Sequence, residues 1–144
     1  MTWTRLHDAC QHQDIKTVID LSHRCSEEAV MVDDHGSTPL HIACWGNPSL
    51  EVIQALVMAC PQATTDTDIH GNTPLHIAAS QPEMTAAVVR VMLDTCPTAV
   101  SMTNKEGLTP LHMACRYAPM NTLVISMLID AYPYALRTRT KVRK

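Results

Sequence analysis

Apolar residues in this chain recur in short blocks that share one internal pattern. Within each block they occupy positions i, i+1, i+4 and i+5, which lie on one face of an α-helix. The blocks are 52–57, 88–93 and 124–129. Each is followed by a proline, so we expect helices that stop before Pro61, Pro97 and Pro133, with an extended polar stretch after each.

A shorter helix is predicted ahead of each block. The tetrapeptide Thr-Pro-Leu-His occurs at 38–41, 73–76 and 109–112, and a weaker copy, Thr-Arg-Leu-His, occurs at 4–7. Threonine is a good helix N-cap, and proline at the first helical position already has a helical φ. A glycine three residues before each proline permits the positive φ of a tight turn. We expect these short helices to end before Pro48, Pro82 and Pro119.

The spacing of the tetrapeptides, 35 and 36 residues, indicates a repeat architecture in which each unit stacks on its neighbours. All nine prolines occupy three equivalent positions in the repeat. The six cysteines occupy two, and the first of these also holds an alanine, Ala79. The sequence therefore predicts a solenoid of helix pairs.

The segment Asp-Asp-His-Gly-Ser-Thr-Pro-Leu-His-Ile-Ala-Cys at 33–44, with its two later copies, resembles the ankyrin repeat family. The resemblance runs from about Thr4 to Arg137 and implies an all-α solenoid of helix-turn-helix units with β-turn or hairpin fingers. We place the repeats at about 1–32, 33–67, 68–103 and 104–136, as one domain. These units exceed the usual length of about 33 residues, and Cys-Pro or Tyr-Pro replaces the usual glycine after the second helix. We expect both departures to change loops and to leave the stack intact.

Composition places this chain among folded, non-membrane proteins. It is 46% hydrophobic and 17% charged, and it contains no phenylalanine, so the predicted core is aliphatic, Met, Ala and Cys. We expect an intracellular protein, cytoplasmic or nuclear, because we find neither a signal peptide nor a membrane span. Equivalent cysteines in stacked repeats should lie about 8–10 Å apart, too far for a disulfide, so we expect reduced, buried thiols.

Charge is distributed unevenly along the chain. Residues 1–136 carry six basic and fourteen acidic groups, whereas 137–144 carry five basic groups and no acid. An acidic body is unsuited to nucleic acid. The basic tail has three interpretations: a truncated start of a fifth repeat, a nuclear-import or phosphate-binding patch, or a solvated end. The apolar last helix favours a fragment of a longer array, or an end covered by another domain.

Little in the sequence supports catalysis or metal binding. His7/Cys10, His41/Cys44 and His112/Cys115 have helical ligand spacing, but stacking would hold them a repeat apart, whereas zinc needs four convergent ligands. The family resemblance makes this histidine structural. Phosphate loops and hydrolase motifs are absent from the sequence, and the thiols are expected in packing positions. We therefore expect no enzyme activity, no metal and no cofactor.

Binding to another protein is the predicted use. The resemblance implies a concave face built from finger tips and exposed ends of the first helices. It maps partner contacts onto Asp34, His35, Ser37, Trp45, Ile69, His70, Asn72, Ser80, Gln81, Lys105, Glu106, Leu108, Arg116 and Tyr117, with Gln11 and His12 in the first repeat. Ile69 and Leu108 are apolar residues expected at turn tips, which suggests a partly hydrophobic partner.

The aromatic residues outside the core positions are Trp3, Trp45 and Tyr117. Trp, Tyr and Arg are enriched at binding hot spots, so we expect Trp45, Tyr117 and Arg116 to anchor the partner. Trp45 could instead pack over the loop beside Pro48. Two other functions remain open: targeting or nucleic-acid association through the basic tail, and a spacer between domains.

Overall fold

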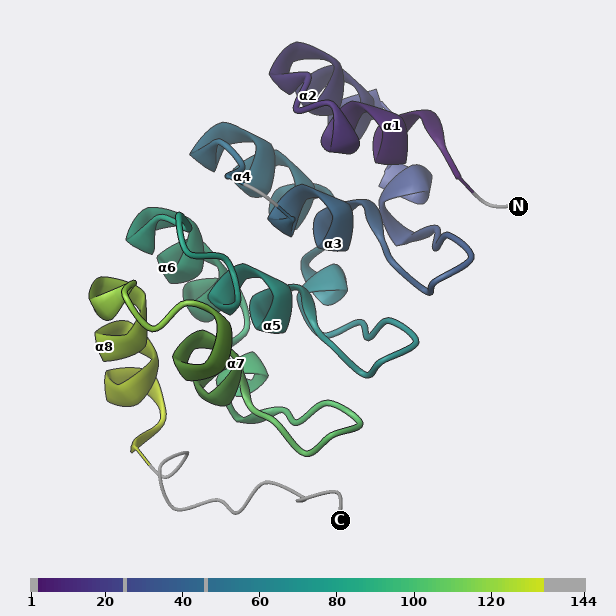
Figure 1. Ribbon diagram of the computed structural model, residues 1–144. Helices are drawn as coiled ribbons and strands as arrows, with labels where there is room; N and C mark the ends of the chain where they lie inside the picture. Colours follow the sequence, from purple (N-terminus) through teal and green to yellow (C-terminus); the bar gives the residue numbers. More distant parts are fainter. Residues whose placement is uncertain (1–2, 25, 46, 134–144) are drawn as a thin grey trace.

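The computed structural model describes residues 3–24, 26–45 and 47–133. Eight α-helices in this part form two rows, with helix pairs stacked from the amino-terminal to the carboxyl-terminal end (Figure 1). The inner row, nearer the fingers, is α1 (Arg5–Gln11), α3 (Pro39–Cys44), α5 (Pro74–Ala79) and α7 (Pro110–Tyr117). The outer row is α2 (Ile15–Arg24), α4 (Leu50–Ala59), α6 (Ala86–Thr95) and α8 (Thr122–Ala131). No strand occurs among the described residues, which confirms the all-α solenoid.

Each inner helix begins as the tetrapeptide predicts. Thr38 is the N-cap of α3, and its hydroxyl oxygen accepts a hydrogen bond from the backbone N–H of His41. The His41 ring in turn accepts from the backbone N–H of Thr38, which completes a capping box. The same reciprocal pair starts α1, α5 and α7, so the weaker copy at Thr4 forms a helix without its proline.

The core lies between the two rows and within each row. Inner helices contact inner helices and outer helices contact outer helices along the stack. Small buried residues such as Ala43, Cys44, Ala78 and Ala114 let the inner helices approach closely. None of the described helices is both long and apolar enough to cross a bilayer.

The polar stretch predicted directly after Pro61 and Pro97 does not begin there, because a short 3-10 helix comes first; the stretch predicted after Pro133 lies outside the described residues. Pro61 and Pro97 do end their helices, but each then starts a short 3-10 helix, η2 (Pro61–Thr64) and η3 (Pro97–Ser101). A proline at the first helical position already has a helical φ, so it can begin a new turn directly after it has stopped the old one. These turns bury apolar residues, including Ala63 and Ala99, against the core. The first repeat has an equivalent, η1 (Ser26–Val30), without a proline.

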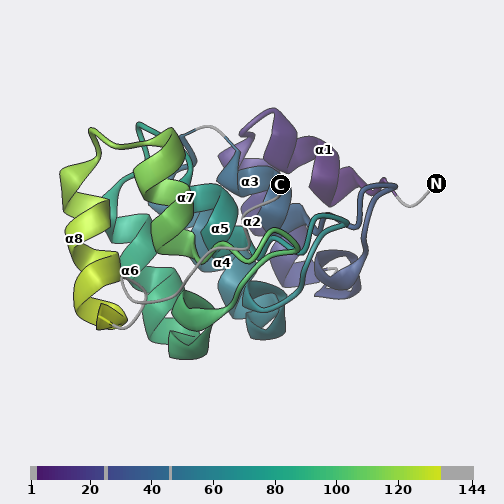
Figure 2. The same ribbon diagram turned by 60° about the horizontal axis from the view of Figure 1, so that its bottom comes forward.

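The predicted fingers project from the inner row between successive repeats (Figure 1). At each tip a glycine has positive φ, +72° at Gly36, +76° at Gly71 and +79° at Gly107. The Asp33 carboxylate accepts from the backbone N–H groups of His35 and Ser37, at 2.8 and 2.9 Å, and so stabilises the turn. Asp68 and Asn104 make the same pair of bonds in the next fingers. Figure 2 shows the fingers running side by side.

Candidate functional site

The repeated histidine connects neighbouring repeats. The Nδ1 atom of His41 lies 2.9 Å from the hydroxyl of Thr38, and Nε2 lies 2.9 Å from the backbone carbonyl of Asn72 in the next repeat. A carbonyl can only accept, so Nε2 carries the proton and donates, while Nδ1 accepts. His7 binds the carbonyl of Ser37 at 3.0 Å, and His76 binds that of Leu108 at 2.9 Å. This confirms the structural role that the resemblance implied.

Burial favours the neutral imidazole at the central junctions. Removal from water lowers the pKa of His41 and His76. The hydrogen bonds to the Asn72 and Leu108 carbonyls raise it, and so do carboxylates such as Asp68, but they only partly offset the effect of burial. A proton added to Nδ1 would also face the N–H of the capping threonine and break the capping box. Protonation would therefore cost the bond that Nδ1 accepts in the capping box, whereas the bond that Nε2 donates to the next repeat can form in either charge state.

Stability is expected to fall as pH drops below about 6.5, the ordinary histidine pKa. Because the folded-state pKa values of His41 and His76 are lowered, their contribution is fully present above pH 6.5. It is lost as pH falls toward the folded-state values, by at most about 1.4 kcal/mol per histidine for each pH unit. Urea unfolding at pH 7.5, 6.5 and 5.5 measures this loss. A constant unfolding free energy over this range would contradict the prediction.

The thiols divide into buried and accessible groups. Burial raises the pKa of Cys10 to about 12 and also raises the pKa of Cys44, so both stay protonated at neutral pH. Cys60 is also buried, and Cys96 is half-buried. Cys115 departs from the expected packing position and is exposed, because it lies on the side of α7 that no described element covers. In the described part of the chain, no group of three or more His, Cys, Asp or Glu residues could hold a metal ion.

The structure sorts the fourteen predicted contacts by exposure. The exposed residues are Asp34, His35, Trp45, Ile69, His70, Lys105, Glu106, Arg116 and Tyr117. The half-buried residues are Asn72, Ser80 and Gln81. The buried residues are Ser37 and Leu108, which are 6% and 7% exposed.

Ser37, Asn72 and Leu108 are equivalent residues, each directly before a capping threonine. Their carbonyls accept the histidine bonds from the preceding repeat, so this position belongs to the internal junction. The Asn72 side chain also accepts from the Asn104 side chain at 2.9 Å. The expectation that Leu108 is an apolar residue at a turn tip is therefore wrong, because the junction turns it inward. Ile69 does lie exposed at its tip.

The finger tips form a continuous row. The backbone N–H of Ile69 donates to the carbonyl of His35 at 2.9 Å, and that of Lys105 donates to the carbonyl of His70 at 3.0 Å. These bonds hold each tip against the next. The side chains of Asp34, Ile69 and Lys105 occupy one equivalent position in the row, and those of His35, His70 and Glu106 occupy another.

The carboxyl-terminal ends of the inner helices form a second row. Trp45 caps α3, Ser80 caps α5, and Arg116 is the equivalent residue of α7. The guanidinium of Arg116 lies 5.7 Å from the ring centre of Tyr117 and 3.5 Å from the carboxylate of Glu106. Because Glu106 is a finger-tip residue, this ion pair connects the two rows. We call the surface that both rows share the inner face.

Trp45 and Tyr117 are 57% and 52% exposed, so neither aromatic ring is covered by its neighbouring loop. A hollow of about 270 Å³ lies between the loops of the second and third repeats and is lined by Asn47, Gln81, Pro82 and Glu83. Met120, in the loop after α7, is also highly exposed. It was not identified from the sequence, because the pattern around it indicates only a loop. The basic tail at 137–144 lies outside the described residues, as do Cys25 and Gly46.

Comparison with known families agrees with this architecture. A family model described as ankyrin repeats (many copies) matches residues 21–78. Two models described as ankyrin repeat match residues 70–104 and 106–138. The search of curated proteins found no match.

Proposed function

Because this chain belongs to the ankyrin repeat family, whose members are generally protein–protein interaction modules, we propose that it binds a partner protein across its inner face without catalysis. The observation that carries the proposal is the exposure of Trp45 and Tyr117 at the ends of two inner helices. Large aromatic side chains left in water on a folded surface are typical of binding hot spots.

Comparison of the repeats within the chain supports this choice of face. The capping tetrapeptide is the same in three repeats, because the junctions require it. By contrast, two sets of equivalent positions on the inner face differ in every repeat: Trp45, Ser80 and Arg116 at the helix ends, and Asp34, Ile69 and Lys105 at the tips. The packing between repeats does not restrict which residue types occupy these positions, so the residues there can be suited to a partner.

The inner face is also well suited to bind without a large ordering cost. Its tips are held by backbone bonds from one finger to the next, and its helix ends belong to capped helices. A preorganised surface loses little conformational entropy on association. The Arg116–Glu106 pair is exposed and contributes little to stability, so Arg116 can exchange Glu106 for a partner carboxylate at low cost.

The test is a quantitative pull-down from native lysate with the full chain and the Trp45→Ala/Tyr117→Ala variant. We expect the variant to bind the captured partner about 2 kcal/mol more weakly, roughly thirtyfold. The matched control is Ile15→Ala/Met58→Ala, which removes two exposed apolar side chains from the outer row and should bind normally. Circular dichroism must first show that all variants fold alike.

A chain that ends at Leu136 separates the remaining possibilities. Binding that survives the double substitution but is lost with the tail would overturn the proposal in favour of the basic segment. Binding by none of the proteins would favour a spacer. A partner that is retained by the truncated chain and released by the double substitution supports the inner face.

A further inference from the structure

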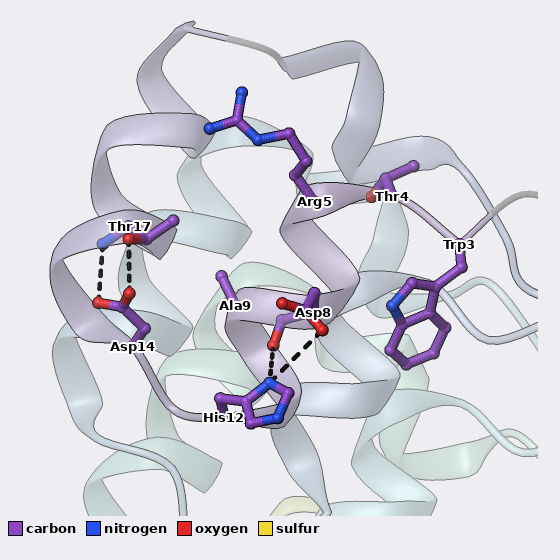
Figure 3. Close-up of a pocket in the computed structure, with 8 residues that line it drawn as sticks. All are labelled: Trp3, Thr4, Arg5, Asp8, Ala9, His12, Asp14 and Thr17. Atoms are coloured by element: carbon purple, nitrogen blue, oxygen red, sulfur yellow. Dashed lines mark hydrogen bonds and ion pairs between the residues drawn. The ribbon is translucent and has the colours of Figure 1, made fainter.

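Two hollows flank Trp3 at the amino-terminal end of the stack. The larger, about 640 Å³, is open to solvent and runs along α1 to the start of α2 (Figure 3). The smaller, about 190 Å³, lies between Trp3 and the finger of the second repeat. Trp3 lines both hollows and therefore lies between them.

Trp3 is held in place but remains accessible. It stands directly before the capping Thr4, the position that Ser37 and Leu108 hold in later repeats. In those repeats this residue is buried in a junction, whereas Trp3 is 39% exposed. Its ring lies 5.2 Å from the ring of His7, which is fully buried and bound to the Ser37 carbonyl. The indole thus has a fixed support on one side and open space beside it.

The lining of both hollows is acidic. Asp8 and Asp14 line the larger, and Asp33 and Asp34 line the smaller. Asp14 accepts two hydrogen bonds from Thr17, which lower its pKa, and Asp33 is engaged in its own turn. The Asp34 carboxylate is exposed and has no hydrogen-bond or ion-pair partner within the described residues.

The four carboxylates outnumber the basic side chains beside them, Arg5 in the lining and Lys16, whose charge acts on Asp14. Asp8 is 3.5 Å from His12, an exposed contact that leaves the carboxylate open to water. Arg5 is the one lysine or arginine among the described residues that line the two hollows. Trp3 and Asp8 line the same hollow, and in the view of Figure 3 the Arg5 side chain is directed away from both. An incoming cation would therefore meet an aromatic face with carboxylates on both sides.

We propose that Trp3, Asp8 and Asp34 form a site for an arginine side chain in a basic segment of a partner protein. The inference rests on the proposed function and names the chemistry of the partner at this end of the stack. A guanidinium can stack flat on the indole while its N–H groups donate to carboxylates at the edges. The acidic lining disfavours nucleic acid and acidic peptides, and its charge disfavours a purely apolar segment.

The probe is an acetylated, amidated peptide with two arginines separated by glycine, and its control replaces arginine by citrulline, which has nearly the same shape without charge. The chain has two tryptophans, whose indole N–H resonances are distinguished with a Trp3→Phe variant. We expect the arginine peptide to shift the Trp3 resonance and leave that of Trp45 in place. The citrulline peptide should shift neither.

Substitutions then test the individual groups by calorimetry. Trp3→Leu keeps an apolar contact with His7 and should weaken peptide binding about fivefold. Asp8→Asn/Asp34→Asn should weaken binding about fivefold, whereas Glu51→Gln/Asp94→Asn, the same charge change on the outer row, should do so less than twofold. Equal losses in the two double variants, equal binding of citrulline, or no effect of Trp3→Leu would each overturn the site.

The pull-down with the same variants separates this inference from the proposed function. A partner released by Trp45→Ala/Tyr117→Ala but retained by Trp3→Leu, together with no peptide binding, leaves the function standing and rejects the arginine site. Peptide binding at Trp3 with a partner indifferent to the inner-face substitutions rejects the function and supports the site.

Discussion

His76→Ala is expected to lower the free energy of unfolding by about 4 kcal/mol, a large share of the roughly 5–15 kcal/mol typical of a domain. The substitution leaves the buried N–H of Thr73 and the Leu108 carbonyl without their partner, and each unsatisfied group costs about 1–3 kcal/mol. These two groups together account for the expected loss, because the other half of the capping box, from the His76 backbone N–H to the Thr73 hydroxyl, remains in the variant. Urea unfolding followed by circular dichroism at pH 7.5 measures the loss.

His112→Ala is the matched control. His112 makes the same capping box with Thr109, but it is half-buried and its Nε2 has no partner among the described residues. We expect a loss of about 1.5 kcal/mol, from the cap and a smaller loss of packing. Equal losses for the two variants would show that the bond from one repeat to the next contributes nothing.

Gly71→Ala is expected to cost about 3 kcal/mol. At φ +76° a side chain adds about 1–2 kcal/mol of conformational strain. A Cβ atom would also lie 2.8 Å from the backbone nitrogen of Lys105, in the next finger. That nitrogen donates to the His70 carbonyl, so relieving the contact would weaken the bond between fingers. Thermal unfolding should show a decrease in Tm of about 3 °C for each kcal/mol lost.

Gly36→Ala provides the comparison for this prediction. Its φ is +72°, but the nearest atom to an added Cβ is the Ile69 nitrogen at 3.2 Å, which a small shift relieves. We expect a loss of about 1.5 kcal/mol, mostly conformational strain. A Gly36 variant as unstable as the Gly71 variant would mean that finger contact adds nothing to the strain.

The candidate site was only partly predictable from the sequence. Trp45, Arg116 and Tyr117 could be placed at exposed helix ends, because the repeat identifies equivalent positions and the core pattern excludes them. The burial of Ser37 and Leu108 was not predictable, because the residue before the capping threonine lies in a junction whose hydrogen bond comes from the histidine of another repeat. Trp3 was recognisable as an aromatic outside the core, but the smaller of its two hollows depends on the finger at Asp33–His35.

The sequence by itself determined the repeat, the helix starts and the turns, because these depend on local interactions: a threonine cap, a proline at the first helical position, and a glycine with positive φ. Only the tertiary structure decided which residues are exposed on the inner face and which serve the junctions. It also decided that Pro61 and Pro97 begin 3-10 helices and that Cys115 is exposed. These outcomes depend on contacts between residues about thirty positions apart, or on whether another element covers a helix. Neither can be predicted from the pattern of neighbouring residues in the sequence.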